Sequence, residues 1–255
     1  MPEGDTVYLA AQRLNTALRG QTIVGSDFRI PRYATVNLSG KVIREVRPAG
    51  KHLFFDLGDV SLHTHFKMQG SWHLYRRGER WRKPAYQARV ILKTQPWDAV
   101  GFDLPVIELV TDPQAVVAHL GPDLLAQDFD LGEAVRRMTL DPDRSLGDCL
   151  LDQTVVAGLG NVYKSEVAFL AGLDPRTVVK RVPDVADVLQ LARRMIRANR
   201  STGSQITTGD TRRGRQRWVY GRAGSPCLRC GTRIAMERDG TERVTYWCPA
   251  CQPEL

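Results

Sequence analysis

Apolar residues recur at helical spacing in the first twenty positions and at every second position afterwards. One helix face over residues 3–19 carries Val7, Ala10, Ala11, Leu14 and Leu18, and Gly20 follows as a stop signal. Short β-rich runs punctuated by Gly, Pro and Asp follow at residues 21–30, 41–47, 52–57, 60–66, 71–75, 87–93 and 106–110. Many short strands are typical of a sandwich or barrel. We therefore expect an N-terminal β-sandwich led by one helix.

The pattern changes around residues 112–126, where Leu120-Gly121-Pro122-Asp123 has the composition of a linker. Helical periodicity then predicts helices over residues 113–119, 131–138, 145–157, 161–171 and 183–199. Residues 200–226 are rich in Gly, Ser, Thr and Arg and are expected to form a loop. The fold class is thus α+β, with a β-sandwich at 1–122, a helical domain at 123–222 and a small cysteine hairpin at 223–255.

Charge indicates a polyanionic partner. The chain has 255 residues and a net charge of +8. The stretch from Arg193 to Arg222 holds nine arginines against Asp210, a net charge as large as that of the whole chain. A solvated, Arg-rich helix end beside a loop would give the same pattern. The chain contains no run of about 18 apolar residues and no basic, apolar leader, so we expect a cytoplasmic protein without a membrane span.

Four of the five cysteines form two C-x2-C pairs separated by seventeen residues, Cys227 and Cys230 followed by Cys248 and Cys251. This spacing is typical of a zinc ribbon, in which four thiolates close a tetrahedron around one structural Zn²⁺. Unmetallated or disulfide-bonded thiols are the alternative. The strand at 243–247 leads into the third cysteine, and this makes Arg243 a candidate DNA contact. We interpret Cys149 as a buried helix residue without a role.

Two further motifs carry possible chemistry. The 145–157 helix is expected to end at Ala157 in a Gly158-Leu159-Gly160 turn, after which Asn161 caps the next helix and its exposed amides suit a phosphate. Removal of Met1 would leave Pro2 with a secondary amine that is partly unprotonated at neutral pH and able to attack a sugar carbon. Glu3 beside it suits general acid/base catalysis. A plain helical hairpin and an ordinary helix N-terminus explain the same residues.

Taken together, these motifs resemble the Fpg/Nei family of DNA glycosylases with lyase activity, over essentially the whole chain. The resemblance rests on Pro2-Glu3-Gly4-Asp5-Thr6, Gly50-Lys51-His52-Leu53, His65-Phe66-Lys67-Met68-Gln69-Gly70, Ala157-Gly158-Leu159-Gly160-Asn161 and the zinc hairpin. It implies a helix–two-turn–helix over about residues 145–172 and a monomer that acts on damaged double-stranded DNA, with single-stranded or bubble DNA as further possible substrates.

The resemblance also implies roles for individual residues. Pro2 matches the nucleophile at C1′, Glu3 the acid/base, and Lys51 the lysine that holds a phosphate near the lesion. Asn161 and Arg243 match the residues that hold the phosphates flanking the extruded nucleotide. Met68, in the Lys67-Met68-Gln69 loop, matches the side chain that fills the space left in the duplex. Strand cleavage by β,δ-elimination in base excision repair is the implied activity.

Two features of the sequence bear on lesion preference. Gly4-Asp5-Thr6 resembles the Nei (endonuclease VIII) branch, and residues 97–102, taken as a second loop, lack the Arg of the Fpg wedge. Both features favour oxidised pyrimidines over 8-oxoguanine. The loop Thr207–Arg217 is a candidate cover for the flipped base. The alternatives are Fpg-type specificity, a non-catalytic damaged-DNA-binding paralogue and a zinc-ribbon RNA-binding module; the intact Pro2-Glu3 pair argues against a pure binder.

Overall fold

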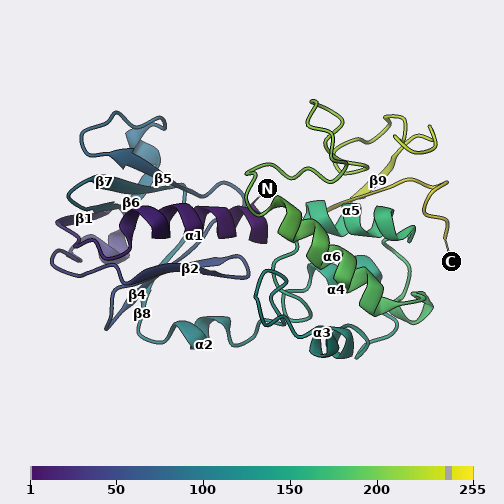
Figure 1. Cartoon of the computed structure of the whole chain (residues 1–255), viewed down its shortest axis with the longest axis horizontal. Coiled ribbons are helices and arrows are strands. Elements are labelled where there is room, and N and C mark those ends of the chain that lie inside the picture. The colour runs from purple at the N-terminus through teal and green to yellow at the C-terminus, as the bar shows by residue number, and fades with distance from the viewer. Residues whose placement is uncertain (1, 239–242, 255) are drawn as a thin grey trace. The chain divides into compact units, whose positions relative to one another are not determined.

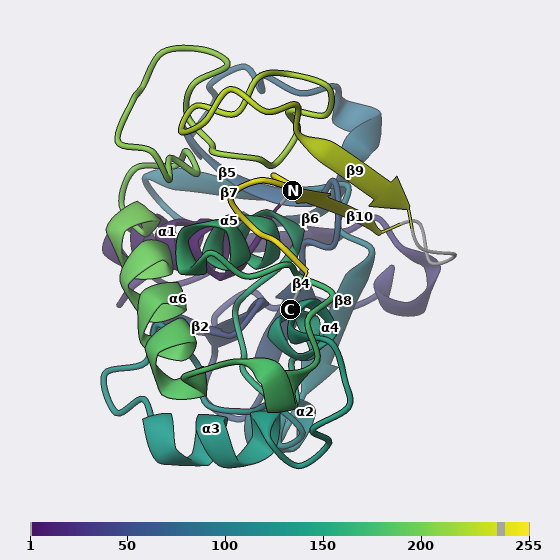
Figure 2. The same cartoon turned by 90° about the vertical axis from the view of Figure 1, so that its right-hand side faces the viewer.

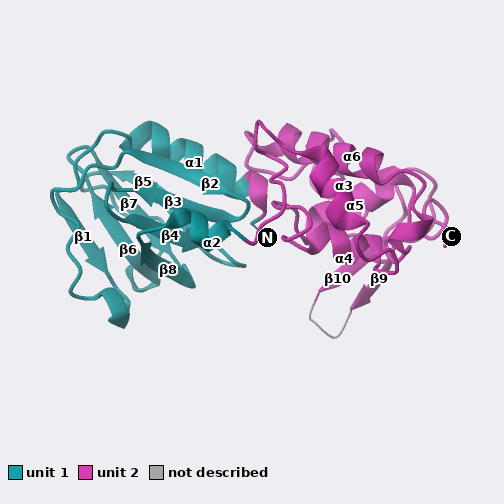
Figure 3. Cartoon of the chain, turned by 90° about the horizontal axis from the view of Figure 1, so that it is seen from below, with its two compact units in different colours: residues 1–2, 6–118 teal, residues 3–5, 119–255 magenta. Residues whose placement is uncertain are grey.

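The computed structural model describes residues 2–238 and 243–254, which form two compact units (Figure 3). Unit 1 contains Pro2 and Thr6–Ala118, whereas unit 2 contains Glu3–Asp5 and His119 onward. The helix α1 (Gly4–Leu18) therefore begins in unit 2 and continues in unit 1. Within the described ranges, the helices are too short or too polar to cross a bilayer.

Unit 1 is a sandwich of two four-stranded antiparallel sheets (Figure 1). One sheet has the order β1-β6-β7-β5 and the other β2-β3-β4-β8. The strands are β1 (Gly25–Phe28), β2 (Glu45–Ala49), β3 (His52–Asp56), β4 (Ser61–His65), β5 (Ser71–Arg76), β6 (Ala88–Lys93), β7 (Trp97–Phe102) and β8 (Val106–Val110), and the short helix α2 (Pro113–Val117) follows. The predicted β-sandwich with a leading helix is confirmed.

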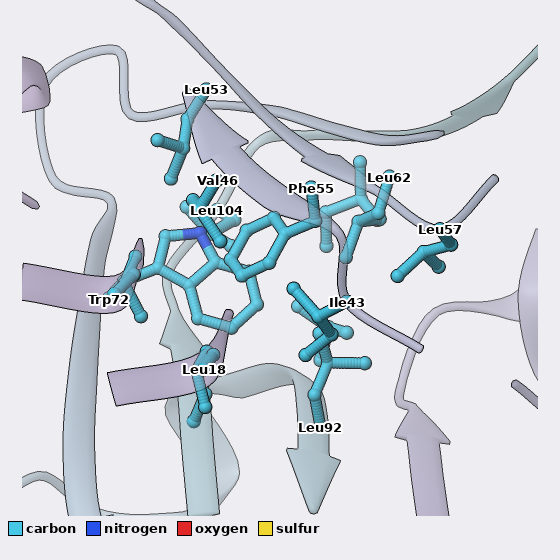
Figure 4. Packing of buried hydrophobic residues seen from close by; sticks show 14 of the residues in the cluster. Leu18, Ile43, Val46, Leu53, Phe55, Leu57, Leu62, Trp72, Leu92 and Leu104 are labelled. Carbon is cyan, nitrogen blue, oxygen red and sulfur yellow. The ribbon is translucent and has the colours of Figure 1, made fainter. Parts of the chain in front are cut away.

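The core of unit 1 lies between α1 and the inner faces of the two sheets. Figure 4 shows Trp72 of β5 against Phe55 of β3, with ring centroids 4.7 Å apart. The indole nitrogen of Trp72 donates to Thr64 Oγ1 at 3.1 Å, so the buried polar atom is satisfied. Leu14 and Leu18 belong to the same cluster, which explains the helical spacing of apolar residues at the start of the chain.

Residues 97–102 correct one prediction from the sequence. They form no loop but the strand β7, which pairs with both β5 and β6. Ala99, Val100 and Phe102 are buried. The connection that follows it is the short segment 103–105, which contains no Arg. The segment 103–105, and not residues 97–102, is therefore the loop to compare with the Fpg wedge, and it too lacks an Arg.

Unit 2 is helical, with a small hairpin at its C-terminal end (Figure 2). Its helices are α3 (Leu131–Met138), α4 (Leu146–Leu151), α5 (Asn161–Ala171) and α6 (Val185–Asn199), and its strands are β9 (Ala235–Arg238) and β10 (Val244–Trp247). Short 3-10 turns occur at Pro31–Tyr33 and Ala85–Gln87 in unit 1 and at Val179–Arg181 in unit 2. The helical domain and the terminal hairpin are thus confirmed as elements of the fold.

The helix predicted over 145–157 is too long. It ends at Leu151, because the Asp152 side chain accepts hydrogen bonds from Thr154 N (2.9 Å) and Thr154 Oγ1 (2.7 Å) and so stabilises a turn in place of another helical turn. Gly158 has a φ of +109°, a conformation that favours glycine. The chain between α4 and α5 is consequently a longer, two-turn connection that delivers Gly160 to the start of α5.

Candidate functional site

The carboxylate of Glu3 binds the N-terminus of α5. Glu3 is fully buried, and its Oε1 accepts a hydrogen bond from Val162 N at 2.7 Å. Its Oε2 accepts from Gly160 N at 2.7 Å and from Tyr163 N at 3.4 Å. Amide groups in the first turn of a helix lack intrahelical partners and carry the positive end of the helix dipole, so they suit an anion. The amides predicted to bind a phosphate are therefore occupied by the protein's own carboxylate.

This arrangement also corrects the predicted helix cap. The N-cap of α5 is Gly160, not Asn161, and it makes no side-chain capping bond. A Cβ at Gly160 would lie 2.6 Å from Glu3 Cδ, closer than such atoms approach in proteins. Glycine is thus required here because the Glu3 carboxylate packs directly against the backbone.

Asp5 and Tyr163 form a second buried pair that sequence reasoning missed. Tyr163 Oη donates to Asp5 Oδ2 at 2.9 Å, and both residues are buried. Burial, followed by the charge of Asp5, raises the pKa of Tyr163 far above its usual range, so it remains a phenol donor. Pro2 precedes this buried stretch and is half-buried itself, whereas Met1 lies outside the described residues.

The other end of the α5 first turn contacts the terminal hairpin. Asn161 Nδ2 donates to Val244 O at 2.6 Å, and the buried Lys164 donates through Nζ to Thr245 Oγ1 at 2.7 Å. Arg243 is exposed and directly precedes Val244. The structure therefore brings together Asn161 and Arg243, two predicted phosphate contacts that are far apart in the sequence.

The four paired cysteines converge on one point. Their Sγ atoms all lie within 4.8 Å of one another, with 4.0 Å between Cys227 and Cys251 and 3.5 Å between Cys230 and Cys248. A tetrahedral site with Zn–S bonds of about 2.3 Å needs sulfur atoms about 3.8 Å apart. The donor set and spacing thus fit one structural zinc ion. Gln252 links this site to the chain just beyond α5, because its side chain accepts from Cys248 N and donates to Leu173 O.

The long loop between α6 and the hairpin is held by one buried carboxylate. Glu166 of α5 is fully buried and accepts from Trp218 N (2.8 Å), Val219 N (2.9 Å) and Tyr220 N (2.8 Å), and Thr207 Oγ1 donates to it as well. Sequence reasoning missed this residue because a Glu in a helix is ordinarily exposed. Residues 207–220 contain no helix or strand, yet their ends are fixed to the helix whose first turn holds Glu3.

In unit 1, strand register brings the remaining predicted residues to one edge of the sandwich. Ala49 pairs with His52, and His52 pairs with His65, so the turn containing Lys51 and the 66–70 loop lie at the same strand ends. Lys67, Met68 and Gln69 are exposed, and Met68 has an exposed fraction of 61%. We call this region the Lys51–Met68 edge. An exposed methionine at a loop tip is an unusual use of an apolar side chain.

A histidine cluster behind this edge is a further feature that the sequence analysis missed. His63 Nδ1 lies 3.0 Å from Glu108 Oε2, and its Nε2 lies 2.8 Å from His52 Nδ1. His65 lies edge-on to His52 at 5.0 Å, and its Nδ1 accepts from Lys67 N at 2.9 Å. The signal was present in the alternating positions 63 and 65, which share one face of a strand.

Because of this histidine cluster, we expect the free energy of unfolding to fall at acidic pH. Burial, followed by the charges of His52, Lys67 and Lys51, lowers the pKa of His65 to about 3, whereas an unfolded histidine titrates near 6.5. Below pH 6.5 the unfolded state therefore binds more protons, and the free energy of unfolding falls by about 1–2 kcal/mol between pH 7 and pH 5. Urea denaturation at the two pH values measures this loss. We expect a smaller loss for His65→Gln, and an equal loss would contradict the assignment.

Comparisons with known proteins agree with this geometry. The family model for the formamidopyrimidine-DNA glycosylase N-terminal domain matches residues 1–104, and that for the formamidopyrimidine-DNA glycosylase H2TH domain matches residues 120–206. A third model, the zinc finger found in FPG and IleRS, matches residues 224–253. Together with the clustered sulfur atoms, this match makes the terminal hairpin a zinc finger that holds one ion.

Similar proteins cover the chain from end to end. It is 50% identical to the DNA-(apurinic or apyrimidinic site) lyase Nei2 of Mycolicibacterium smegmatis, over 99% of each chain. It is 49% identical to the probable endonuclease 8 2 of Streptomyces coelicolor, over 99% of this chain and 94% of the relative. Among solved structures, Lactococcus lactis Fpg bound to abasic-site DNA matches with a TM-score of 0.83 and 24% identity, over 99% and 100% of the two chains.

Proposed function

We propose that this chain, which belongs to the Fpg/Nei family of base excision repair glycosylases with abasic-site lyase activity, removes oxidised pyrimidines through an amine at Pro2. Its similarity to proteins named Nei2 and endonuclease 8 2 supports the endonuclease VIII branch. The observation that carries the proposal is the buried Glu3 carboxylate, held by three backbone amides one residue after Pro2. A protein that only binds DNA has no need for a carboxylate fixed beside its N-terminus.

The proposed reaction begins once Met1 is removed. The Pro2 nitrogen attacks C1′ of the damaged nucleotide, the bond from C1′ to the base breaks, and the base leaves with a proton. The ring bond from C1′ to O4′ then breaks, O4′ takes a proton from Glu3, and the lone pair of the Pro2 nitrogen forms an iminium with C1′. This iminium makes the C2′ protons acidic. Loss of one of them expels the 3′ phosphate, and a second elimination expels the 5′ phosphate. Glu3 is the group that delivers and accepts protons during ring opening and elimination.

The remaining site residues are proposed to hold DNA. Lys51 and Lys67 offer ammonium groups at the Lys51–Met68 edge, where Gln69 adds an amide, and Asn161 and Arg243 offer donors beside the hairpin. Such contacts to phosphate fix the position of the duplex without reading its sequence. We propose that the domains are a catalytic β-sandwich at 1–122, a helical domain at 123–222 and a zinc hairpin at 223–255. We further propose that the protein is a monomer that acts in the cytoplasm, on the nucleoid.

Met68 is proposed to fill the space of the extruded nucleotide, because it is the apolar residue at the tip of an exposed loop. Extrusion of a base costs a few kcal/mol in a duplex and little in a single strand. We therefore expect Met68→Ala to lower single-turnover base release from duplex DNA by about tenfold or more, while release from a single strand changes little. Equal losses on the two substrates would exclude a wedge role.

The preference for pyrimidines is supported by the branch and by the short 103–105 connection, which has no Arg for a second wedge. Fpg-type specificity for 8-oxoguanine is the second candidate, favoured by the likeness of the fold to Lactococcus lactis Fpg. A second structure of Lactococcus lactis Fpg, which matches with a TM-score of 0.82 and 25% identity, is a complex with DNA that contains an oxidised pyrimidine, so the fold alone does not separate the two lesion classes.

Borohydride trapping tests the proposal directly. Enzyme confirmed by mass spectrometry to lack Met1 is incubated with DNA containing 5,6-dihydrouracil, 8-oxoguanine or a plain abasic site. We expect a covalent adduct with dihydrouracil that is absent or much reduced in Pro2→Gly. An adduct with 8-oxoguanine and none with dihydrouracil would establish the alternative specificity. Absence of trapping on all three substrates, with DNA binding intact, would establish a non-catalytic binder.

A further inference from the structure

The end of β5, the connection to β6 and the start of β6 are together strongly basic. Residues 76–89, which we call the 76–89 segment, carry one acidic side chain, Glu79, against six basic ones, namely Arg76, Arg77, Arg80, Arg82, Lys83 and Arg89. Its net charge of +5 compares with +8 for the whole chain. Most of the segment is exposed, and Tyr86 has an exposed fraction of 76%. No role in the proposed chemistry accounts for this concentration of charge.

The 76–89 segment is held against the outer face of the β1-β6-β7-β5 sheet. Trp81 packs on Phe102 with ring centroids 5.9 Å apart, and Arg82 N donates to Tyr75 Oη at 3.1 Å. Arg29 stacks on Trp81 at 5.6 Å and donates to Ala85 O at 2.9 Å. These contacts fix the backbone of the segment, so the basic side chains are presented from a defined surface and not from a loose loop.

This surface is continuous with the Lys51–Met68 edge. Ser71, the residue after the 66–70 loop, pairs with Phe102, and Ala88 at the end of the segment pairs with Phe102 from the other side. Lys83 Nζ also lies 3.3 Å from Asp103 Oδ2 in the β7–β8 connection. Strand register therefore brings one end of the segment to the strand ends that carry the Met68 loop.

Few acidic groups neutralise the segment. Glu79 accepts from Arg76 N, Asp103 pairs with Lys83, and Asp27 pairs with Arg29. Within residues 2–238 and 243–254, no ion pair joins Arg77, Arg80 or Arg82 to a carboxylate. The segment runs from the Arg76–Trp97 end of the sheet, where Arg77 N donates to Pro96 O, back to the Ser71–Phe102 end beside the Met68 loop. Its three guanidinium groups stand on a fixed backbone and offer charged, planar donors that can bind phosphate groups bidentately.

We propose that the 76–89 segment binds the phosphate backbone of the duplex that flanks the damaged nucleotide, beyond the contacts made at the Lys51–Met68 edge. This inference rests on the proposed function, because that function places damaged duplex DNA at the edge. It adds a contact that neither the chemistry nor base extrusion requires. Binding energy supplied there is independent of sequence and of the lesion, and it depends strongly on salt concentration.

The test compares two triple variants. One variant replaces Arg77, Arg80 and Arg82 by Gln. The matched control also replaces three exposed arginines of unit 1 by Gln, namely Arg13, Arg19 and Arg44. Dissociation constants are measured by fluorescence anisotropy on two duplexes with a non-cleavable abasic analogue. One duplex just covers the lesion, and the other is extended by one helical turn on each side. An undamaged extended duplex is measured in parallel.

We expect the first variant to weaken binding of the extended duplex by tenfold or more. The slope of log Kd against log salt concentration should become less steep by about 2–3, since each lost phosphate contact accounts for about 0.9. Binding of the short duplex should change by less than about twofold, and the control variant should match wild type on both. Unchanged affinity and slope on the extended duplex, or equal losses on the two duplexes, would overturn the proposal.

Failure of the proposed function gives a different result. In that case wild type shows neither strand scission nor preference for the lesion. The undamaged extended duplex still reports whether the 76–89 segment contacts DNA, because the phosphate contacts are independent of the lesion. Single-turnover scission at saturating enzyme, measured on a duplex of the short length that carries a natural abasic site in place of the analogue, serves as the check that the Arg77, Arg80 and Arg82 replacements leave the fold and the reaction intact.

Discussion

Replacing Glu3 by Gln is expected to slow base excision by about 10²–10⁴-fold, the usual contribution of general acid/base catalysis. The substitution removes the ionisable group while keeping the shape of the side chain. It also exchanges one acceptor oxygen for an NH₂ group that faces backbone N–H donors of α5. A loss of about 1–3 kcal/mol in the free energy of unfolding accompanies the loss of activity for this reason. Single-turnover kinetics and urea denaturation measure the two effects separately.

Asp174→Asn is the matched control, because Asp174 is another buried carboxylate of unit 2 that accepts from a backbone amide, that of Arg176. It should lose stability to a similar degree and retain the rate of excision. Gly160→Ala reaches the same carboxylate by an independent route, since the new Cβ displaces Glu3 without altering its chemistry. Excision that survives in both Glu3→Gln and Gly160→Ala would refute an acid/base role for Glu3.

Loss of the zinc ion is expected to cost DNA binding about a hundredfold or more. A structural zinc site supplies on the order of 10 kcal/mol to the folding of its domain. In Cys248→Ser the hairpin loses this support, and Asn161 and Lys164 lose their partners on β10. The two proposed phosphate contacts at Asn161 and Arg243 are then no longer positioned, and each charge-assisted hydrogen bond is worth about 1.5–3 kcal/mol.

Zinc content by mass spectrometry and Kd for an abasic analogue check this prediction. Cys149→Ala is the control, because Cys149 is buried in α4 outside the metal cluster and its loss should leave one zinc ion per chain. Retention of both zinc and wild-type affinity in Cys248→Ser would show that the hairpin folds without a complete set of ligands.

Features set by neighbouring residues were predictable from the sequence. Helical spacing located α3 and α5 to the residue, and the C-x2-C pairs located the metal cluster. Residues 97–102 were misassigned because Asp98 and Gly101 interrupt the β-rich run, whereas pairing on both sides stabilises the strand. Helix α4 was predicted to be too long because the turn stabilised by Asp152 replaces further helix, and the spacing of apolar residues does not indicate such a turn.

The arrangement of the candidate site depends on contacts that no local pattern encodes. The sequence places Glu3 beside Pro2, but only the fold shows its carboxylate on the first turn of α5. Likewise, His63 looks like one of several histidines on a strand until Glu108 and His52 are found on either side of it. Glu166 looks like a solvated helix residue until residues 207–220 fold over it. In all three cases the sequence shows a side chain that can form hydrogen bonds, but it does not show which distant residue is its partner.

The bonds between Glu3 and α5 span 157–160 positions in the chain, and this separation has a consequence for how the protein is made. Synthesis proceeds at about 5–20 residues per second, so the amides that receive Glu3 are translated roughly 8–30 seconds after it. During that interval the nascent amino terminus cannot bind to α5, because α5 has not yet been translated. An aminopeptidase therefore has time to remove Met1 and expose the Pro2 nitrogen before the completed helix buries the adjoining residue. The order of translation thus favours removal of Met1 from the proposed nucleophile, Pro2, before Glu3 beside it is buried.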